Sequence, residues 1–164
     1  MKRYADVYSI FGAFQEPWQR HCQNVARLSQ LIAKTIDGCD DQFAYVYGLV
    51  HDIGRSTERS KKDPRFHCVD GFLILDCLGY DELKMAPLTH SFPCLSNLSL
   101  VPGYYNPLWD PDASIMDKQR YAEKGIHEWD TFIPEHLQGY KATNYDIIIL
   151  LADLMSARSE EHTS

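Results

Sequence analysis

The chain contains 164 residues, of which 45% are hydrophobic and 12% aromatic, enough for one domain with a buried core. Its 16 Lys and Arg against 23 Asp and Glu give a net charge of -7, which argues against a general nucleic-acid coat protein and a basic membrane-surface binder. The negative charge therefore predicts no stable nucleic-acid partner. No apolar run approaches the ~20 residues of a membrane-spanning helix, so we also expect no membrane partner.

The predicted elements of the first part of the chain are helical, because apolar residues recur there at three- and four-residue steps. Helices are predicted over residues 18–36, 41–52, 67–78 and 81–90. Gly38 supplies a stop for the first helix, and Asp40 or Asp41 caps the second. Pro87 must bend or end the fourth. Residues 55–65 are polar and rich in Lys and Arg, and they predict a loop.

The second part of the chain is less regular. Prolines and aromatic residues interrupt helical patterning over 91–113, and one or two short helices are expected over 114–139. A last helix is predicted over 144–157, capped by Thr143 together with Asp146, and residues 159–164 are expected to be a flexible tail. The sequence therefore predicts an all-α single domain over 1–164, with its core over 18–158 and an irregular aromatic and proline-rich excursion between residues 91 and 139.

The cysteines indicate a reducing compartment. They are odd in number and contain no C-x-x-C pair: Cys22, Cys39, Cys68, Cys77 and Cys94. Reduced thiols fit this set better than a disulfide framework or a cysteine-rich zinc site. No apolar stretch follows the basic residues near Met1, so a secretory signal is not expected. We therefore expect a cytoplasmic protein.

Several polar side chains stand where helix faces should be apolar: His21, His51, Asp52, His67, His90 and Asp153. A single histidine in such a place is usually a core or boundary residue, and a single aspartate is often a cap. Several such coincidences in one small domain favour a common cause. Imidazole and carboxylate groups are ligands of zinc, iron and manganese, and a bound cation would offset the cost of burying Asp52 and Asp153.

The ordered pattern H…HD…H…H…D resembles the HD-domain metal-dependent phosphohydrolases, and residues 51–54 spell the HDIG form of that family. The resemblance spans 18–158 and implies a helical bundle that binds two divalent metal ions, with iron, manganese, zinc, cobalt and nickel all possible. It implies that His21, His51 and Asp153 hold one ion, that His67 and His90 hold the second, and that Asp52 bridges them. The long interval before Asp153 leaves Asp146 as an alternative ligand.

The resemblance also implies a reaction. A hydroxide bridging the two ions would cleave a phosphate ester or anhydride of a small phosphorylated substrate, possibly a nucleotide, with Asp52 as the catalytic carboxylate. Candidates for binding the phosphate are Arg55, Lys61, Lys62 and Arg65. The aromatic residues Tyr104, Tyr105 and Trp109 would either form a wall or lid that stacks on a nucleobase or pack as an ordinary excursion. His127, His136 and His162 are expected in surface or structural positions.

Two other functions fit the same residues. Some HD-fold proteins hold two irons in a similar six-ligand pattern and use dioxygen to oxidise a C–H bond of a phosphonate or polyol. A non-catalytic regulatory domain that binds a nucleotide or metal is the third alternative, and the presence of all six residues argues against it. The pattern specifies neither the substrate, the metal nor the oligomeric state.

Overall fold

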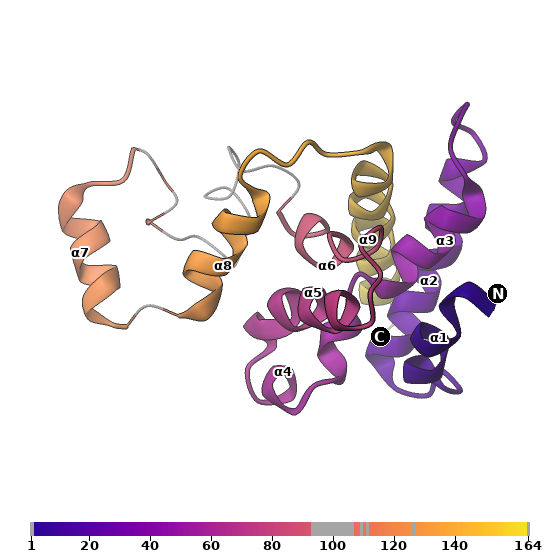
Figure 1. The fold of residues 1–164 in the computed structure, drawn as a ribbon, viewed down its shortest axis with the longest axis horizontal. Helices are drawn as coiled ribbons and strands as arrows, with labels where there is room; N and C mark the ends of the chain where they lie inside the picture. The colour runs from indigo at the N-terminus through magenta and orange to yellow at the C-terminus, as the bar shows by residue number, and fades with distance from the viewer. Residues whose placement is uncertain (1, 93–106, 109, 111, 126, 164) are drawn as a thin grey trace.

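The computed structural model describes residues 2–92, 107, 108, 110, 112–125 and 127–163, and all regular elements within these ranges are helices (Figure 1). The α-helices are α1 (Ala5–Phe11), α2 (Pro17–Ala33), α3 (Asp41–Val50), α4 (Glu58–Lys62), α5 (His67–Cys77), α6 (Ala86–Thr89), α7 (Ile115–Glu123), α8 (Glu128–Leu137) and α9 (Asn144–Thr163). The 3-10 helices are η1 (Lys2–Tyr4), η2 (Ile53–Ser56) and η3 (Pro64–Phe66). The predicted all-α fold is confirmed. Among the described helices, none has the length and apolar character to cross a bilayer.

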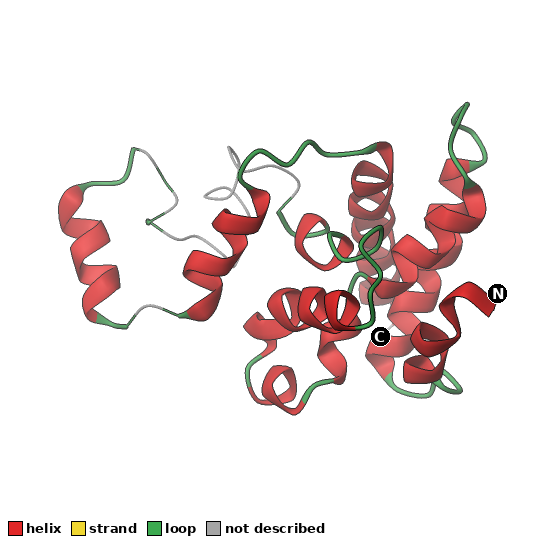
Figure 2. Ribbon diagram, viewed as in Figure 1, coloured by secondary structure: helices red, strands yellow, loops and turns green. Residues whose placement is uncertain are grey.

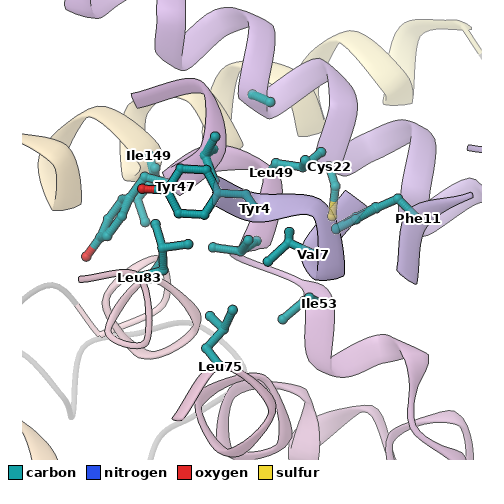
Figure 3. Close-up of a cluster of buried hydrophobic side chains, with 14 residues drawn as sticks. Tyr4, Val7, Phe11, Cys22, Tyr47, Leu49, Ile53, Leu75, Leu83 and Ile149 are labelled. Carbon is teal, nitrogen blue, oxygen red and sulfur yellow. The ribbon is translucent and has the colours of Figure 1, made fainter. Parts of the chain in front are cut away.

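A bundle of α2, α3 and α9 forms one side of the molecule (Figure 2). α6 packs directly on α3 and α9, and α5 packs on α6 and on η2. The start of α3 follows from its cap, because the Asp40 carboxylate accepts hydrogen bonds from the backbone N–H groups of Gln42 and Phe43. The main apolar cluster lies between these helices and includes Val7, Phe11, Cys22 and Leu49 from α1, α2 and α3 (Figure 3). This core sets the relative positions of the helices that carry the polar residues.

Glycines allow the closest approaches in the bundle. A Cβ on Gly54 would lie 1.9 Å from the carbonyl oxygen of His67, so η2 can contact α5 only because residue 54 has no side chain. A Cβ on Gly71 would lie 2.8 Å from Cβ of Pro87, which lets α6 lie against α5. On α3, a Cβ on Gly48 would lie 3.0 Å from Cα of Ala26 on α2. The glycine of the HDIG segment is therefore a packing requirement.

The helix boundaries differ from the predictions in several places. Residues 55–65 are not a loop: Thr57 caps α4 through the N–H of Ser60, and Asp63 caps η3 through the N–H of Arg65. These caps make short helices from a polar segment that lacks an apolar stripe. The fourth predicted helix is regular only over α6, which begins just before Pro87. The second predicted helix ends at Val50, and α9 continues to Thr163 instead of ending at residue 157.

The excursion contains two helices, α7 and α8, which lie to one side of the bundle (Figure 1). α8 joins the body through a second apolar cluster, in which Trp129 and Ile133 pack with Phe72, Leu88 and Phe92. α7 has no buried residue. Thus α8 is anchored by apolar packing, whereas α7 contributes nothing to the core.

Candidate metal centre

Three helix ends and two helix faces bring the candidate side chains together. His51 follows the last residue of α3, His67 begins α5 and His90 follows the last residue of α6, whereas His21 and Asp153 lie on α2 and α9. Asp52 comes directly after His51. His51, Asp52, His67 and His90 are at most 5% exposed. Helices remote in sequence thus converge on one buried polar site.

The first group of side chains is built around His51. Its Nε2 atom lies 3.3 Å from Nε2 of His21, 3.9 Å from Oδ2 of Asp52 and 3.8 Å from Oδ1 of Asp153. His21 and Asp153 are themselves 2.9 Å apart. Two ligands on neighbouring vertices of an ion with bonds of about 2.0–2.1 Å are about 2.9 Å (octahedral) to 3.3 Å (tetrahedral) apart. The distances from His21 to His51 and to Asp153 lie within this range, whereas those from His51 to Asp52 and to Asp153 are longer, so His21 is the centre of the closest spacing in this group.

The second group joins His67, His90 and the other oxygen of Asp52. The two Nε2 atoms are 3.3 Å apart, and Oδ1 of Asp52 lies 3.3 Å from His67 and 3.4 Å from His90. Although buried, Oδ1 has no hydrogen-bond partner among the described residues. A buried carboxylate oxygen without a partner is costly, and a cation is the ligand that removes this cost.

Backbone carbonyls orient the imidazole rings. Nδ1 of His51 donates to the carbonyl of Gly48 at 2.6 Å, Nδ1 of His67 to that of Pro64 at 2.5 Å, and Nδ1 of His90 to that of Ala86 at 3.3 Å. Because a carbonyl only accepts, these Nδ1 atoms carry the proton, and the neutral rings present Nε2 lone pairs to the site. Lone pairs of His67 and His90 thus face each other and Asp52, an arrangement that repels unless a cation or proton lies between them.

Without a metal, burial and neighbouring charges shift the pKa values of the residues at this site. Burial raises the pKa of Asp52, but His51, His67 and His90 outweigh burial and hold it well below its ordinary value. Burial lowers the pKa of His90 to about 3. Burial also lowers that of His67, yet Cys68 and Asp52 reverse the effect and raise it to about 9. A proton on His67 therefore takes the place of a cation in the second group.

A cavity of about 570 Å³ opens onto both groups. It is lined by Pro17, Trp18, His21, Asp52, Arg55, His67, His90, Ser91, Asp153 and Ala157. Arg55 lies at its wall and donates from Nε to Oδ2 of Asp52 at 2.6 Å. The cavity thus combines buried histidines and carboxylates, a guanidinium group and an indole ring.

Comparison with known proteins identifies this arrangement. A family model of the HD domain matches residues 18–158, most of the chain. The chain belongs to the HD-domain family. The resemblance noted from the HDIG segment is therefore confirmed, and HD domains bind divalent metals at groups of this kind. The comparisons found no match among curated proteins and none among solved structures.

Asp146, the alternative ligand, lies outside the candidate metal site. Asp146 is buried, but both of its oxygens are hydrogen-bonded, Oδ1 to Tyr47 and Thr89 and Oδ2 to Tyr140 and Thr143. Asp153, two helical turns further along α9, faces His21 and His51. The interpretation of Asp146 as a substitute ligand is wrong, because its lone pairs already have donors.

Only one of the four candidate phosphate-binding residues lies at the cavity. Arg55 lines the cavity, whereas Lys61, Lys62 and Arg65 do not. Lys61 pairs with Glu58 at 2.9 Å, and Arg65 pairs with Asp63 at 2.8 Å and lies over the ring of Trp129. The predictions for Tyr104, Tyr105 and Trp109 lie outside the described residues.

The histidines of the excursion occupy structural positions. His127 precedes α8 and stacks on Trp129, with ring centroids 4.1 Å apart. His136 donates from Nδ1 to the carbonyl of Phe132 and stacks on the Phe132 ring.

Sequence reasoning missed three residues at the site. Trp18 lies three residues before His21, a spacing that places both on one helix face. Ser91 directly follows His90 and also lines the cavity. Cys68 follows His67, and its sulfur lies 3.4 Å from Nε2 of His67. Each is a sequence neighbour of a candidate ligand, which is the signal that could have found it.

Proposed function

We propose that this HD domain is a metal-dependent phosphohydrolase that cleaves a phosphate ester or anhydride of a nucleotide or related small metabolite. The observation that carries the proposal is the buried Asp52. One of its oxygens lies beside His67 and His90 and has no hydrogen-bond partner within the part of the chain that the structure describes, and the other accepts from Arg55 at the cavity wall. The site therefore offers a place for cations next to a group that binds phosphate.

Two cations would divide the candidate ligands between them. His21, His51 and Asp153 would hold one ion, His67 and His90 the other, and the carboxylate of Asp52, which has one oxygen near each group, would serve both. When bound, divalent ions of this kind lower the pKa of water and stabilise negative charge on a phosphoryl group. The metals considered are iron, manganese, zinc, cobalt and nickel.

The protein's own side chains would bind and orient the substrate. The Arg55 guanidinium is held by Asp52 and lines the cavity, so it is positioned before substrate arrives. Pro17 and Trp18 form an apolar section of the same wall, which suits the organic part of a phosphorylated metabolite. Burial of the four site residues His51, Asp52, His67 and His90 keeps bulk water from their inner atoms. We further propose that the domain acts as a single unit in the cytoplasm.

The test measures metal content and hydrolysis in the same preparations. Protein purified without chelator is analysed for metals and assayed on an aryl phosphate and a panel of phosphorylated metabolites. We expect hydrolysis that a chelator abolishes and manganese or cobalt restores. His51→Ala should lose both metal and turnover, whereas His136→Ala, which removes a histidine of the excursion, should keep both. Unchanged metal content and turnover in His51→Ala would reject the proposal.

The same preparations test the oxygenase alternative, which uses the same six side chains. Oxygen consumption by iron-loaded protein on a phosphonate or polyol, with no phosphate release from any compound in the panel, would replace the hydrolase with an oxygenase.

A further inference from the structure

One thiol lies beside the second group of candidate ligands. Cys68 is the second residue of α5 and is fully buried, and its Sγ atom lies 3.4 Å from Nε2 of His67. Ligand atoms of His67, Cys68 and His90 all lie within 4.8 Å of one another. Sulfur and nitrogen ligands on one tetrahedral zinc ion, with bonds of about 2.3 and 2.0–2.1 Å, are about 3.5 Å apart. The observed separation is close to this value.

The neighbouring carboxylate gives independent evidence that this position takes a cation. Oδ1 of Asp52 is buried and has no hydrogen-bond partner among residues 2–92 or the described residues after 106, and it lies 3.3 Å and 3.4 Å from the Nε2 atoms of His67 and His90. Cys68 would add a sulfur to the two nitrogens of His67 and His90, which lie beside this oxygen. Cys68 also packs in the apolar cluster with Phe72 and Leu88, so its side chain contacts both hydrocarbon and the Nε2 atom of His67.

The chain contains a matched comparison in its other His-Cys pair. Cys22 follows His21 in α2 and is also fully buried. Both cysteines pack in apolar clusters, Cys22 with Val7 and Phe11 (Figure 3) and Cys68 with Phe72 and Leu88, but among the described residues only Cys68 joins a group of possible metal ligands. The corresponding first group of possible metal ligands contains His21, His51 and Asp52 without a sulfur. The two halves of the site therefore differ in chemistry: one offers nitrogen and oxygen, and the other adds sulfur.

We propose that the Cys68 thiolate is a ligand of the cation held by His67, His90 and Asp52, and that it makes this half of the site selective for a thiophilic divalent ion such as zinc or cobalt. The inference rests on the proposed binding of metal at the site. Binding forms the metal–sulfur bond and releases the thiol proton to solvent. Thiolate ligands favour zinc over manganese, which prefers oxygen.

The experiment uses cobalt as a spectroscopic probe on the full chain. Metal-free protein is titrated with up to two equivalents of Co²⁺, while absorption is recorded and bound cobalt is measured. We expect a sulfur-to-cobalt charge-transfer band in the near ultraviolet that grows with one of the two equivalents. Cys68→Ser should lose the band, and Cys22→Ser should keep it. We also expect Cys68→Ser to weaken zinc binding at one site by more than about tenfold and to leave manganese binding nearly unchanged.

The outcomes separate this inference from the proposed function. Binding of two cobalt ions by the unmodified chain without a charge-transfer band would reject Cys68 as a ligand and leave the metal site intact. A band that survives in Cys68→Ser would also reject it. Failure of the unmodified chain to bind any cobalt would reject both proposals. The spectrum of the unmodified chain decides the question even if Cys68→Ser does not fold.

Discussion

Two buried aspartates, Asp146 and Asp52, show what separates a structural carboxylate from a candidate ligand. Asp146 is fully buried and receives hydrogen bonds from Tyr47, Thr89, Tyr140 and Thr143. Asp52 is 3% exposed, yet no described residue forms a hydrogen bond with one of its oxygens. Burial alone does not distinguish them. The difference lies in whether the protein supplies a hydrogen-bond donor to every carboxylate oxygen. A buried oxygen without a donor needs a bound cation or an added donor to offset the cost of its burial.

The largest effect is expected from Asp52. Asp52→Asn removes the charge shared by both groups, so turnover should fall by about 10³-fold or more, consistent with loss of several kcal/mol of charge stabilisation. Metal content should fall in the same variant. Phosphate release and metal analysis measure the two effects. The matched control is Asp63→Asn, which changes a cap of η3 outside the cavity and should keep both properties. Full metal content in Asp52→Asn would contradict the assignment.

Asp146 should behave in the opposite way. Asp146→Ala leaves the hydroxyls of Tyr47 and Thr89 buried without their acceptor, so the free energy of unfolding should fall by about 3 kcal/mol. Metal content of the folded protein should not change. Urea denaturation and metal analysis test this pair of expectations. Loss of metal from folded Asp146→Ala protein would show that the two aspartates do not have separate roles.

The distance between the two groups of ligands depends on Gly54. Gly54→Ala places a methyl group against the carbonyl of His67 and should destabilise the protein by about 3 kcal/mol as η2 moves away from α5. Ser56→Ala in the same 3-10 helix serves as the control and should cost less than about 1 kcal/mol. Equal unfolding free energies for the two variants would show that this close contact does not hold the site together.

The pH dependence should distinguish metal-free from metal-loaded protein. In metal-free protein the pKa of His90 is lowered to about 3 and that of Asp52 is also lowered, so the unfolded chain binds more protons in acid and stability falls as the pH drops below about 6.5. The pKa of His67 is raised to about 9, so its contribution is present below about 6.5 and is lost as the pH rises to 9.

Metal should remove only the alkaline part of this dependence, since a ligated His67 carries no proton on Nε2. Melting temperatures should therefore fall on both sides of about pH 6.5 without metal, and only on the acid side, together with metal loss below about pH 5.5, in loaded protein. A melting temperature of loaded protein that stays flat from neutral to acid would contradict this expectation.

The smallest effects concern the basic residues. Arg55 lines the cavity, so Arg55→Ala should raise KM for a phosphorylated substrate about tenfold. This is the effect of losing one charge-assisted hydrogen bond at the lower end of its usual contribution of about 1.5–3 kcal/mol. Lys61→Ala should leave KM unchanged, because Lys61 is exposed and pairs with Glu58. Steady-state kinetics test both variants. An increase in KM for Lys61→Ala equal to that for Arg55→Ala would restore the sequence-based assignment of Lys61 as a phosphate ligand.

Much of the helical order was predictable because local features determine it. The apolar spacing of α2, the Asp40 cap of α3 and the Thr143–Asp146 pair at the start of α9 are all readable from neighbouring residues. The short helices over residues 53–66 were not, because their caps act on polar segments without an apolar stripe. The short length of α6 also escaped prediction, since its packing on Gly71 through Pro87 involves a different helix.

The types and order of the candidate ligands, from His21 to Asp146 or Asp153, can be read from the sequence alone. The same ordered pattern indicates the HD-domain family. Only the tertiary structure decided between Asp146 and Asp153. Seven residues of helix separate them by about 10.5 Å along nearly the same face, so helical periodicity treats them alike. The donors that satisfy Asp146 come from Tyr47 and Thr89, and the rings that face Asp153 come from His21 and His51. Such partners are far away in sequence, and only packing of the helices brings them together.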